Sequence, residues 1–125
     1  MGKNLWFELR AFMKRAVRES ELRALDANTF GLLEWLVDQS QTQKDPIYMQ
    51  QVVMESKIAS PATTLKCVGV LEEADLVTVT TDPKDARRRV IRPTRRALAA
   101  MEALGRRAEE WLGPRRCVGL KGKTS

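Results

Sequence analysis

Residues 60–96 decide the fold, and they read SPATTLKCVGVLEEADLVTVTTDPKDARRRVIRPTRR. The pair Ser60-Pro61 marks a helix start, because serine is favoured at the N-cap and proline at the first helical position. We predict a helix over residues 61–74. Its inner face carries Thr64, Val68 and Leu71, at intervals of four and three. Its outer face carries Ala62, Thr63, Leu65, Lys66 and Gly69.

The residues after this helix predict a β-hairpin, the segment 77–92. Residues 77–80 are β-branched and favour a strand, and residues 82–85 favour a turn. Residues 89–92 supply the returning strand. The hairpin has a basic tip, because four cationic residues lie in or beside the turn: Lys84, Arg87, Arg88 and Arg89.

Apolar residues at helical spacing predict four further helices. They cover about residues 5–25, 30–37, 47–53 and 94–112. Asn4 caps the first of them and Thr94 the last. The polar run 39–46 is expected to be a loop, and Gly113-Pro114 is expected to end the last helix.

A helix, a turn, a helix capped by Ser-Pro and a basic hairpin form the element order of a winged helix-turn-helix. The predicted fold class is therefore mainly α with a small β-hairpin wing. We expect one domain over residues 1–112, in which residues 1–25 and 94–112 are dimerisation helices. Residues 113–125 are expected to form a basic, flexible tail.

The positive charge is concentrated in two segments. The chain has 125 residues and a net charge of +6. Residues 82–96 contain seven basic and two acidic residues, a net charge of +5, and residues 113–125 contain four basic residues and no acid. Such concentration is expected where particular elements meet phosphates, although a solvated cationic surface is the alternative.

The composition argues against catalysis. The chain contains no histidine, which removes Ser/His and Cys/His nucleophilic pairs and histidine metal ligands. Cys67 and Cys117 are too far apart in sequence to form a CxxC motif or a zinc site. We therefore expect no enzyme activity, no cofactor and no metal. We also expect no membrane segment and a cytoplasmic location, because the first residues lack an export signal.

The sequence resembles the MarR family of bacterial transcriptional regulators over about residues 26–104. The resemblance is carried by residues 60–66, 71–77, 85–87 and 93–94. It implies that the helix over residues 61–74 lies in the major groove of double-stranded DNA and the hairpin in the minor groove. It further implies that Asp85 orients Arg87, which enters the minor groove. Asp75 stands where the family usually has glycine.

The candidate DNA contacts lie on the predicted recognition helix and the wing. They are Ser60, Ala62, Thr63, Leu65, Lys66, Lys84, Arg87, Arg88 and Arg89, with Asp85 as the orienting residue. Strand alternation sends Arg87 and Arg89 to one side and Arg88 to the other, so we expect Arg87 in the groove and the others on phosphates. The alternatives are an ordinary exposed helix face and an ordinary turn aspartate.

The terminal helices carry more apolar surface than one winged domain needs, which predicts a homodimer on a two-fold symmetric site. The residues concerned are Trp6, Phe12, Met13, Leu98, Met101 and Trp111. Packing on their own core is the alternative. In the MarR family the terminal helices often build a small-molecule pocket as well, but the short chain argues against an effector here.

The function expected from these features is sequence-specific DNA binding as a transcriptional repressor. A winged-helix module that binds RNA or a protein complex is the alternative from another class. Cys67 is expected to be a small buried residue, with a redox switch at Cys67 or Cys117 as the alternative. The basic tail either follows neighbouring phosphates or serves as a solubilising end.

Overall fold

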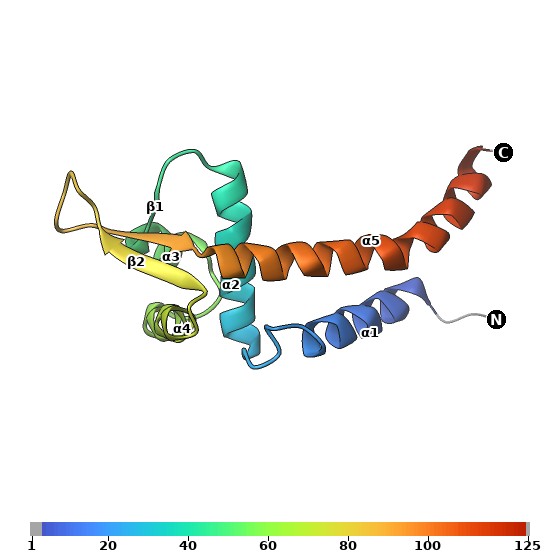
Figure 1. Cartoon of the computed structure of the whole chain (residues 1–125), viewed down its shortest axis with the longest axis horizontal. Coiled ribbons are helices and arrows are strands. Elements are labelled where there is room, and N and C mark those ends of the chain that lie inside the picture. Colours follow the sequence, from blue (N-terminus) through green and yellow to red (C-terminus); the bar gives the residue numbers. More distant parts are fainter. Residues whose placement is uncertain (1–3, 125) are drawn as a thin grey trace. The chain divides into compact units, whose positions relative to one another are not determined.

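The computed structural model describes residues 4–124, and for residues 115–124 it describes the backbone alone. The chain divides into two compact units. We call residues 24–101 the wing unit, and residues 1–23 together with 102–125 the terminal unit. Figure 1 shows one long helix, α5 (Arg95–Thr124), that belongs to both.

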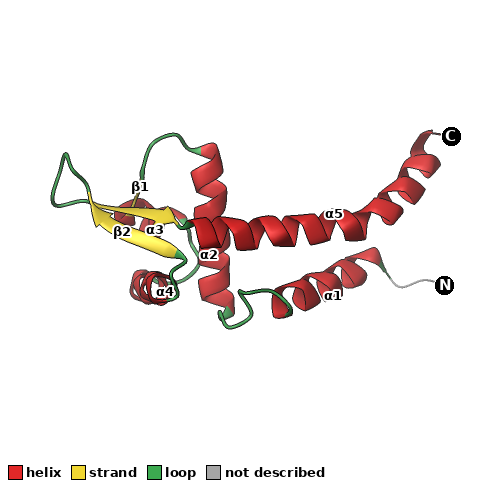
Figure 2. Ribbon diagram, viewed as in Figure 1, coloured by secondary structure: helices red, strands yellow, loops and turns green. Residues whose placement is uncertain are grey.

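The wing unit consists of helices and a small sheet. Its other elements are α2 (Ala27–Thr42), β1 (Ile47–Tyr48), α3 (Met49–Glu55), α4 (Pro61–Glu73), β2 (Val77–Thr81) and β3 (Arg89–Pro93). The strands are antiparallel in the order β1-β3-β2, with Val79 and Ile47 both paired to Ile91 (Figure 2). The predicted fold class, a mainly helical winged helix-turn-helix, is confirmed.

The core of the wing unit lies where α2, α4 and β3 meet. Its buried side chains include Leu32, Leu33 and Leu36 of α2, Val68 and Leu71 of α4, and Ile91 of β3. Two capping side chains set where the helices begin. The Asp26 carboxylate accepts a hydrogen bond from Thr29 N at 2.8 Å, and the Ser60 hydroxyl accepts one from Thr63 N at 3.3 Å.

α4 ends in a left-handed residue, Asp75, whose φ is 61°. Leu76 N donates to Leu71 O at 2.9 Å and Asp75 N donates to Glu72 O at 3.1 Å, which is the hydrogen-bond pattern of a Schellman motif. Thr94 Oγ1 donates to Asp75 O at 2.8 Å and ties this turn to the start of α5. The position therefore requires the conformation that glycine adopts without a Cβ penalty.

Asp75→Gly is expected to raise the free energy of unfolding by about 1 kcal/mol. Glycine removes the Cβ penalty at positive φ, and it removes a carboxylate from the negative end of the α4 dipole. Urea unfolding followed by circular dichroism measures the change. Asp75→Ala is the control, since it removes the carboxylate but keeps the Cβ. If Asp75→Gly is no more stable than Asp75→Ala, the account of this turn is wrong.

The terminal unit pairs α1 (Leu5–Arg18) with the C-terminal part of α5. Asn4 caps α1 as predicted, with its side chain accepting from Trp6 N at 2.8 Å. The rings of Phe12 and Trp111 stack with centroids 5.0 Å apart. Glu19 and Arg107 form an ion pair at 2.8 Å. These contacts hold α1 alongside α5 (Figure 1).

The predicted ends of the first two helices are wrong. α1 ends at Arg18 and not near residue 25, because the Ser20 hydroxyl donates to Val17 O and accepts from Leu22 N, which turns the chain. α2 continues through the polar run to Thr42. There the Ser40 hydroxyl donates to Val37 O at 2.7 Å, so a polar side chain is satisfied within the helix.

The short helix predicted over residues 47–53 begins later than expected. Ile47 and Tyr48 form β1, which pairs with β3, and α3 starts at Met49. The wing is therefore a hairpin flanked by a third strand. A strand of two residues is too short to show the alternation by which strands are recognised in sequence.

The predicted end of the last helix at Gly113-Pro114 is also wrong, because α5 continues to Thr124. Proline inside a helix removes one backbone hydrogen bond and bends the helix, but it does not have to end it. Figure 1 shows α5 bending in its last third. The side chains of Arg115, Arg116, Cys117, Lys121 and Lys123 lie outside the described residues, so the roles assigned to the basic tail remain predictions.

Candidate nucleic-acid interface

The outer face of α4 carries the predicted base-contacting residues. Ala62, Leu65 and Lys66 are exposed, and Thr63 is half-buried. Leu65 exposes 48% of its surface, and a single exposed leucine is not unusual by itself. The inner face is as predicted, because Thr64, Val68 and Leu71 are buried.

The first turn of α4 is held by hydroxyl groups. Ser60 Oγ donates to Thr63 Oγ1 at 3.1 Å, while Thr64 Oγ1 donates to Ala59 O at 3.3 Å. Thr63 accepts from Ser60, so its own hydroxyl hydrogen can be donated to an acceptor outside the chain. Ser60 is thus the helix cap and also fixes the oxygen of a candidate contact residue.

The wing tip is a closed loop between β2 and β3, which projects beyond the helices of the wing unit (Figure 1). Asp82 N donates to Arg88 O at 2.9 Å where the strands end. The buried Asp82 carboxylate accepts from Lys84 N at 3.0 Å. The loop is therefore ordered by its own acids and backbone, and Lys84 is exposed on it.

Asp85 holds Arg87 through two hydrogen bonds. One Asp85 carboxylate oxygen accepts from Arg87 N at 3.0 Å and from Arg87 Nε at 3.3 Å. The Arg87 side chain is nevertheless 92% exposed. The hydrogen bonds from Arg87, backbone first, lower the pKa of Asp85 below its ordinary value. The carboxylate therefore stays ionised at neutral pH, and the pair is lost only when the pH falls through this lowered pKa.

The three consecutive arginines at positions 87–89 point to different places. Arg87 bends back to Asp85, and the Arg88 guanidinium lies 3.5 Å from the centroid of the Tyr48 ring. Arg89 is exposed at the first position of β3, opposite Thr81. The structure thus brings the predicted residues together in two groups on the wing unit, one on α4 and one at the wing tip.

Tyr48 is a functional candidate that sequence reasoning missed. It is the only tyrosine in the chain, and it reaches the wing because β1 pairs with β3. Strand alternation predicts that Arg88 points away from Arg87 and Arg89. It does not predict that the Arg88 guanidinium lies on the Tyr48 ring. Without β1 in the prediction, nothing placed residue 48 beside the wing.

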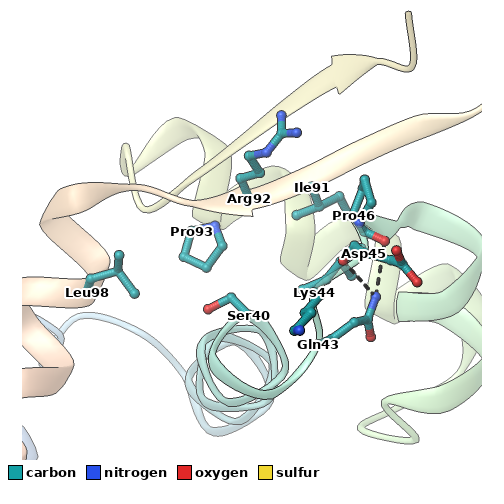
Figure 3. A pocket seen from close by; sticks show the side chains of 10 residues that line it. Ser40, Gln43, Lys44, Asp45, Pro46, Ile91, Arg92, Pro93 and Leu98 are labelled. Atoms are coloured by element: carbon teal, nitrogen blue, oxygen red, sulfur yellow. Dashed lines mark hydrogen bonds between the residues drawn. The ribbon is translucent and has the colours of Figure 1, made fainter. Parts of the chain in front are cut away.

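Cys67 is buried on the inner face of α4, as expected for a small apolar side chain. A cavity of about 350 Å³ lies between the end of α2, the loop before β1, and β3. Figure 3 shows the side chains that line it. Its wall includes Lys44, Ile91, Pro93 and Leu98. The Gln43 amide donates to Asp45 O and Pro46 O and is thereby already engaged. The cavity is near the lower limit of ligand pockets.

In the part of the chain that the structure describes, no helix has the length and apolar character to cross a membrane. No family model matches the sequence, and no curated protein matches it either.

Solved structures share the fold at low sequence identity. A structure of S. aureus MepR bound to DNA is 16% identical with a TM-score of 0.71, and the match covers 95% of this chain and 90% of that one. A transcriptional regulator from Thermotoga maritima is 22% identical with a TM-score of 0.63, over 88% of this chain and 74% of that one.

A third similar structure comes from Bacillus cereus and is described as a MarR-like transcription regulator. It is 14% identical with a TM-score of 0.59, and the match covers 95% of this chain and 88% of that one. The Thermotoga maritima and Bacillus cereus structures are described as transcription regulators, and the S. aureus structure is a complex with DNA. The chain therefore has the winged helix fold of the MarR-type transcription regulators.

Proposed function

We propose that this protein is a transcription regulator of the MarR family that binds double-stranded DNA in a sequence-specific manner as a homodimer. α4 lies in the major groove and supplies base contacts, and the wing, residues 77–92, lies in the minor groove. The protein acts as a repressor, because a DNA-binding surface without catalysis regulates most simply by occupying its site. For a bacterial protein this implies a cytoplasmic location.

The observation that carries this proposal is the Asp85–Arg87 pair. An acid in a strongly basic segment opposes phosphate binding unless it serves to orient a neighbour. Here it accepts two hydrogen bonds from Arg87 and leaves that side chain 92% exposed at the end of a projecting loop. An oriented, exposed guanidinium suits a narrow minor groove, whose negative potential favours arginine.

Two further features support the proposal. The N-terminal half of α4 presents hydroxyl, ammonium and small apolar groups, which are the chemical types that read major-groove base edges and thymine methyl groups. The S. aureus MepR structure with a similar fold is a DNA complex. Both favour duplex DNA over RNA, whose sequence-specific recognition generally uses exposed aromatic side chains.

Selection of duplexes from a random pool by the purified protein at physiological salt tests the proposal. We expect an inverted repeat whose half-sites are centred about 10 bp apart, or about 34 Å, since a dimer presents two recognition helices one helical turn apart. Enrichment of no motif, with binding that disappears steeply as salt rises, would contradict sequence-specific recognition. Preferential binding of structured RNA would instead support the alternative of an RNA-binding module.

Thr63→Ala is expected to change the base preferred at one position of each half-site by about 1–3 kcal/mol. The reason is that alanine removes the hydroxyl that Ser60 fixes and that can donate a hydrogen bond to a base edge. Repeating the selection with the variant measures this change. Lys84→Ala serves as the control, because Lys84 lies on the wing, where loss of a phosphate contact weakens all sequences about equally. Identical motifs for Thr63→Ala and wild type would remove Thr63 from the base-reading residues.

A further inference from the structure

The stack of Arg88 on Tyr48 links the wing to the strand before α3. The Arg88 Cζ lies 3.5 Å from the centroid of the Tyr48 ring, which is close even for a cation–π contact. Tyr48 pairs with Val90 of β3, and Arg88 lies in the wing loop directly before the first residue of that strand. The contact itself places the Arg88 guanidinium on the side of the wing on which the Tyr48 ring lies.

The backbone of Arg88 also closes the wing loop. Arg88 O accepts from Asp82 N at 2.9 Å, and Arg88 N donates to Asp85 O at 3.0 Å. Asp85 is the residue that holds Arg87. Arg88, whose side chain stacks on Tyr48, is thus linked by backbone hydrogen bonds to Asp82 and Asp85.

The stack leaves the donors of Arg88 available. A guanidinium that lies on a ring uses its flat face, whereas its N–H groups radiate in the plane and remain at the edge. Beside the stack is a cleft of about 200 Å³, lined by Tyr48, Met49, Gln50 and the three arginines at positions 87–89. A cleft lined by arginine is suited to a phosphate, which a guanidinium binds in a bidentate manner.

On the basis of the proposed function, we propose that Tyr48 is a positioning residue for DNA binding. Its ring holds Arg88 with its N–H edge toward a backbone phosphate in the cleft beside the wing. Tyr48 acts through Arg88, and the ring rather than the hydroxyl performs this role. The contact is to the DNA backbone and therefore sets affinity and register, not base preference.

The test uses fluorescence anisotropy of a labelled duplex selected by the full-length wild-type protein. Tyr48→Val is expected to weaken binding about fivefold, and Tyr48→Phe to bind within about twofold of wild type, because the stack needs only a ring. Arg88→Ala is expected to reduce the slope of log affinity against log salt by about 1. Tyr48→Val reduces the slope in the same direction. Thermal unfolding by circular dichroism checks that each variant is folded.

A double-mutant cycle shows whether Tyr48 acts through Arg88. In an Arg88→Ala background, Tyr48→Val is expected to cause no further loss. Arg92→Ala is the matched control, since it removes an exposed arginine of β3 that is not part of the stack. In that background Tyr48→Val keeps its full fivefold effect. Equal losses from Tyr48→Val in the Arg88→Ala and wild-type backgrounds overturn the proposal.

Arg88→Lys tests the role of the Arg88 guanidinium even if Tyr48→Val does not fold. Lysine keeps the charge at an exposed position but lacks the planar fork, so binding is expected to weaken about threefold. Wild-type affinity of both Arg88→Lys and Arg88→Ala overturns the inference. If Arg87→Ala weakens binding in the same assay, the proposed function stands even when the inference about Tyr48 fails. If the wild-type protein selects no duplex, the proposed function and the inference about Tyr48 both fail.

Discussion

Arg87→Ala is expected to weaken binding to a selected duplex by about 1–3 kcal/mol, with little dependence on base changes in the major groove. The exposed guanidinium is the group that the wing presents to the minor groove, and alanine removes its charge and its donors together. Titration of labelled duplexes that differ at single major-groove positions measures both parts of the prediction. Lys84→Ala removes the same charge from the same loop and is the matched control.

Asp85→Ala separates orientation from simple electrostatics. The variant has one negative charge fewer, so a non-specific basic surface binds DNA more tightly after the change. If Asp85 orients Arg87 through the two observed hydrogen bonds, its loss weakens binding instead. Unchanged affinity for Arg87→Ala, or tighter binding by Asp85→Ala, would contradict the assignment of the wing.

The second large effect is expected at the exposed apolar face of α1. Leu5, Trp6 and Met13 each expose more than half of their surface, with Trp6 at 61% and Met13 at 52%. Trp6 and Met13 are seven residues apart and therefore share one side of the helix. Phe12 is buried against Trp111, so the exposed side chains are surplus to the packing of this unit. Such a patch marks an interaction surface, and we propose that it is the dimer interface.

The double variant Trp6→Asp/Met13→Asp is expected to be monomeric and to bind a two-half-site duplex at least about 100-fold more weakly. The loss is large because two linked half-site contacts become independent events. Sedimentation equilibrium measures the mass, and anisotropy measures the affinity. Ala11→Asp places an acid on the opposite side of α1 and is expected to leave both unchanged. A double variant that stays dimeric would show that the interface lies elsewhere.

Strong local signals made the wing unit predictable. Ser60-Pro61 combines two capping preferences, and the cap forms as expected. The Asp85–Arg87 pair was also accessible from sequence, because its partners are two residues apart in a turn. Asp75 has a positive φ, which agrees with the glycine that the MarR family usually has at this position. In each case the interaction that decides the structure lies within a few residues of the signal.

The elements missed by sequence reasoning depend on distant partners or on competing local bonds. β1 exists because Ile47 and Tyr48 pair with β3, more than forty positions later in the chain. The end of α1 was misplaced because one hydroxyl, that of Ser20, redirects the backbone within an apolar periodic stretch. Pro114 bends α5 without ending it. The Tyr48–Arg88 stack could not be predicted, because only the pairing of β1 with β3 brings Tyr48 to the wing.

Hydroxyl-radical footprinting of a selected duplex, with wild type and Arg87→Ala compared at saturation, tests the central claim most directly. The claim is that α4 occupies the major groove while the wing tip occupies an adjacent minor groove. We predict protected minor-groove sugars flanking each half-site with wild type. With Arg87→Ala these outer protections disappear while those over the half-sites remain. Outer protections that persist in the variant, or that are absent with wild type, would contradict the claim.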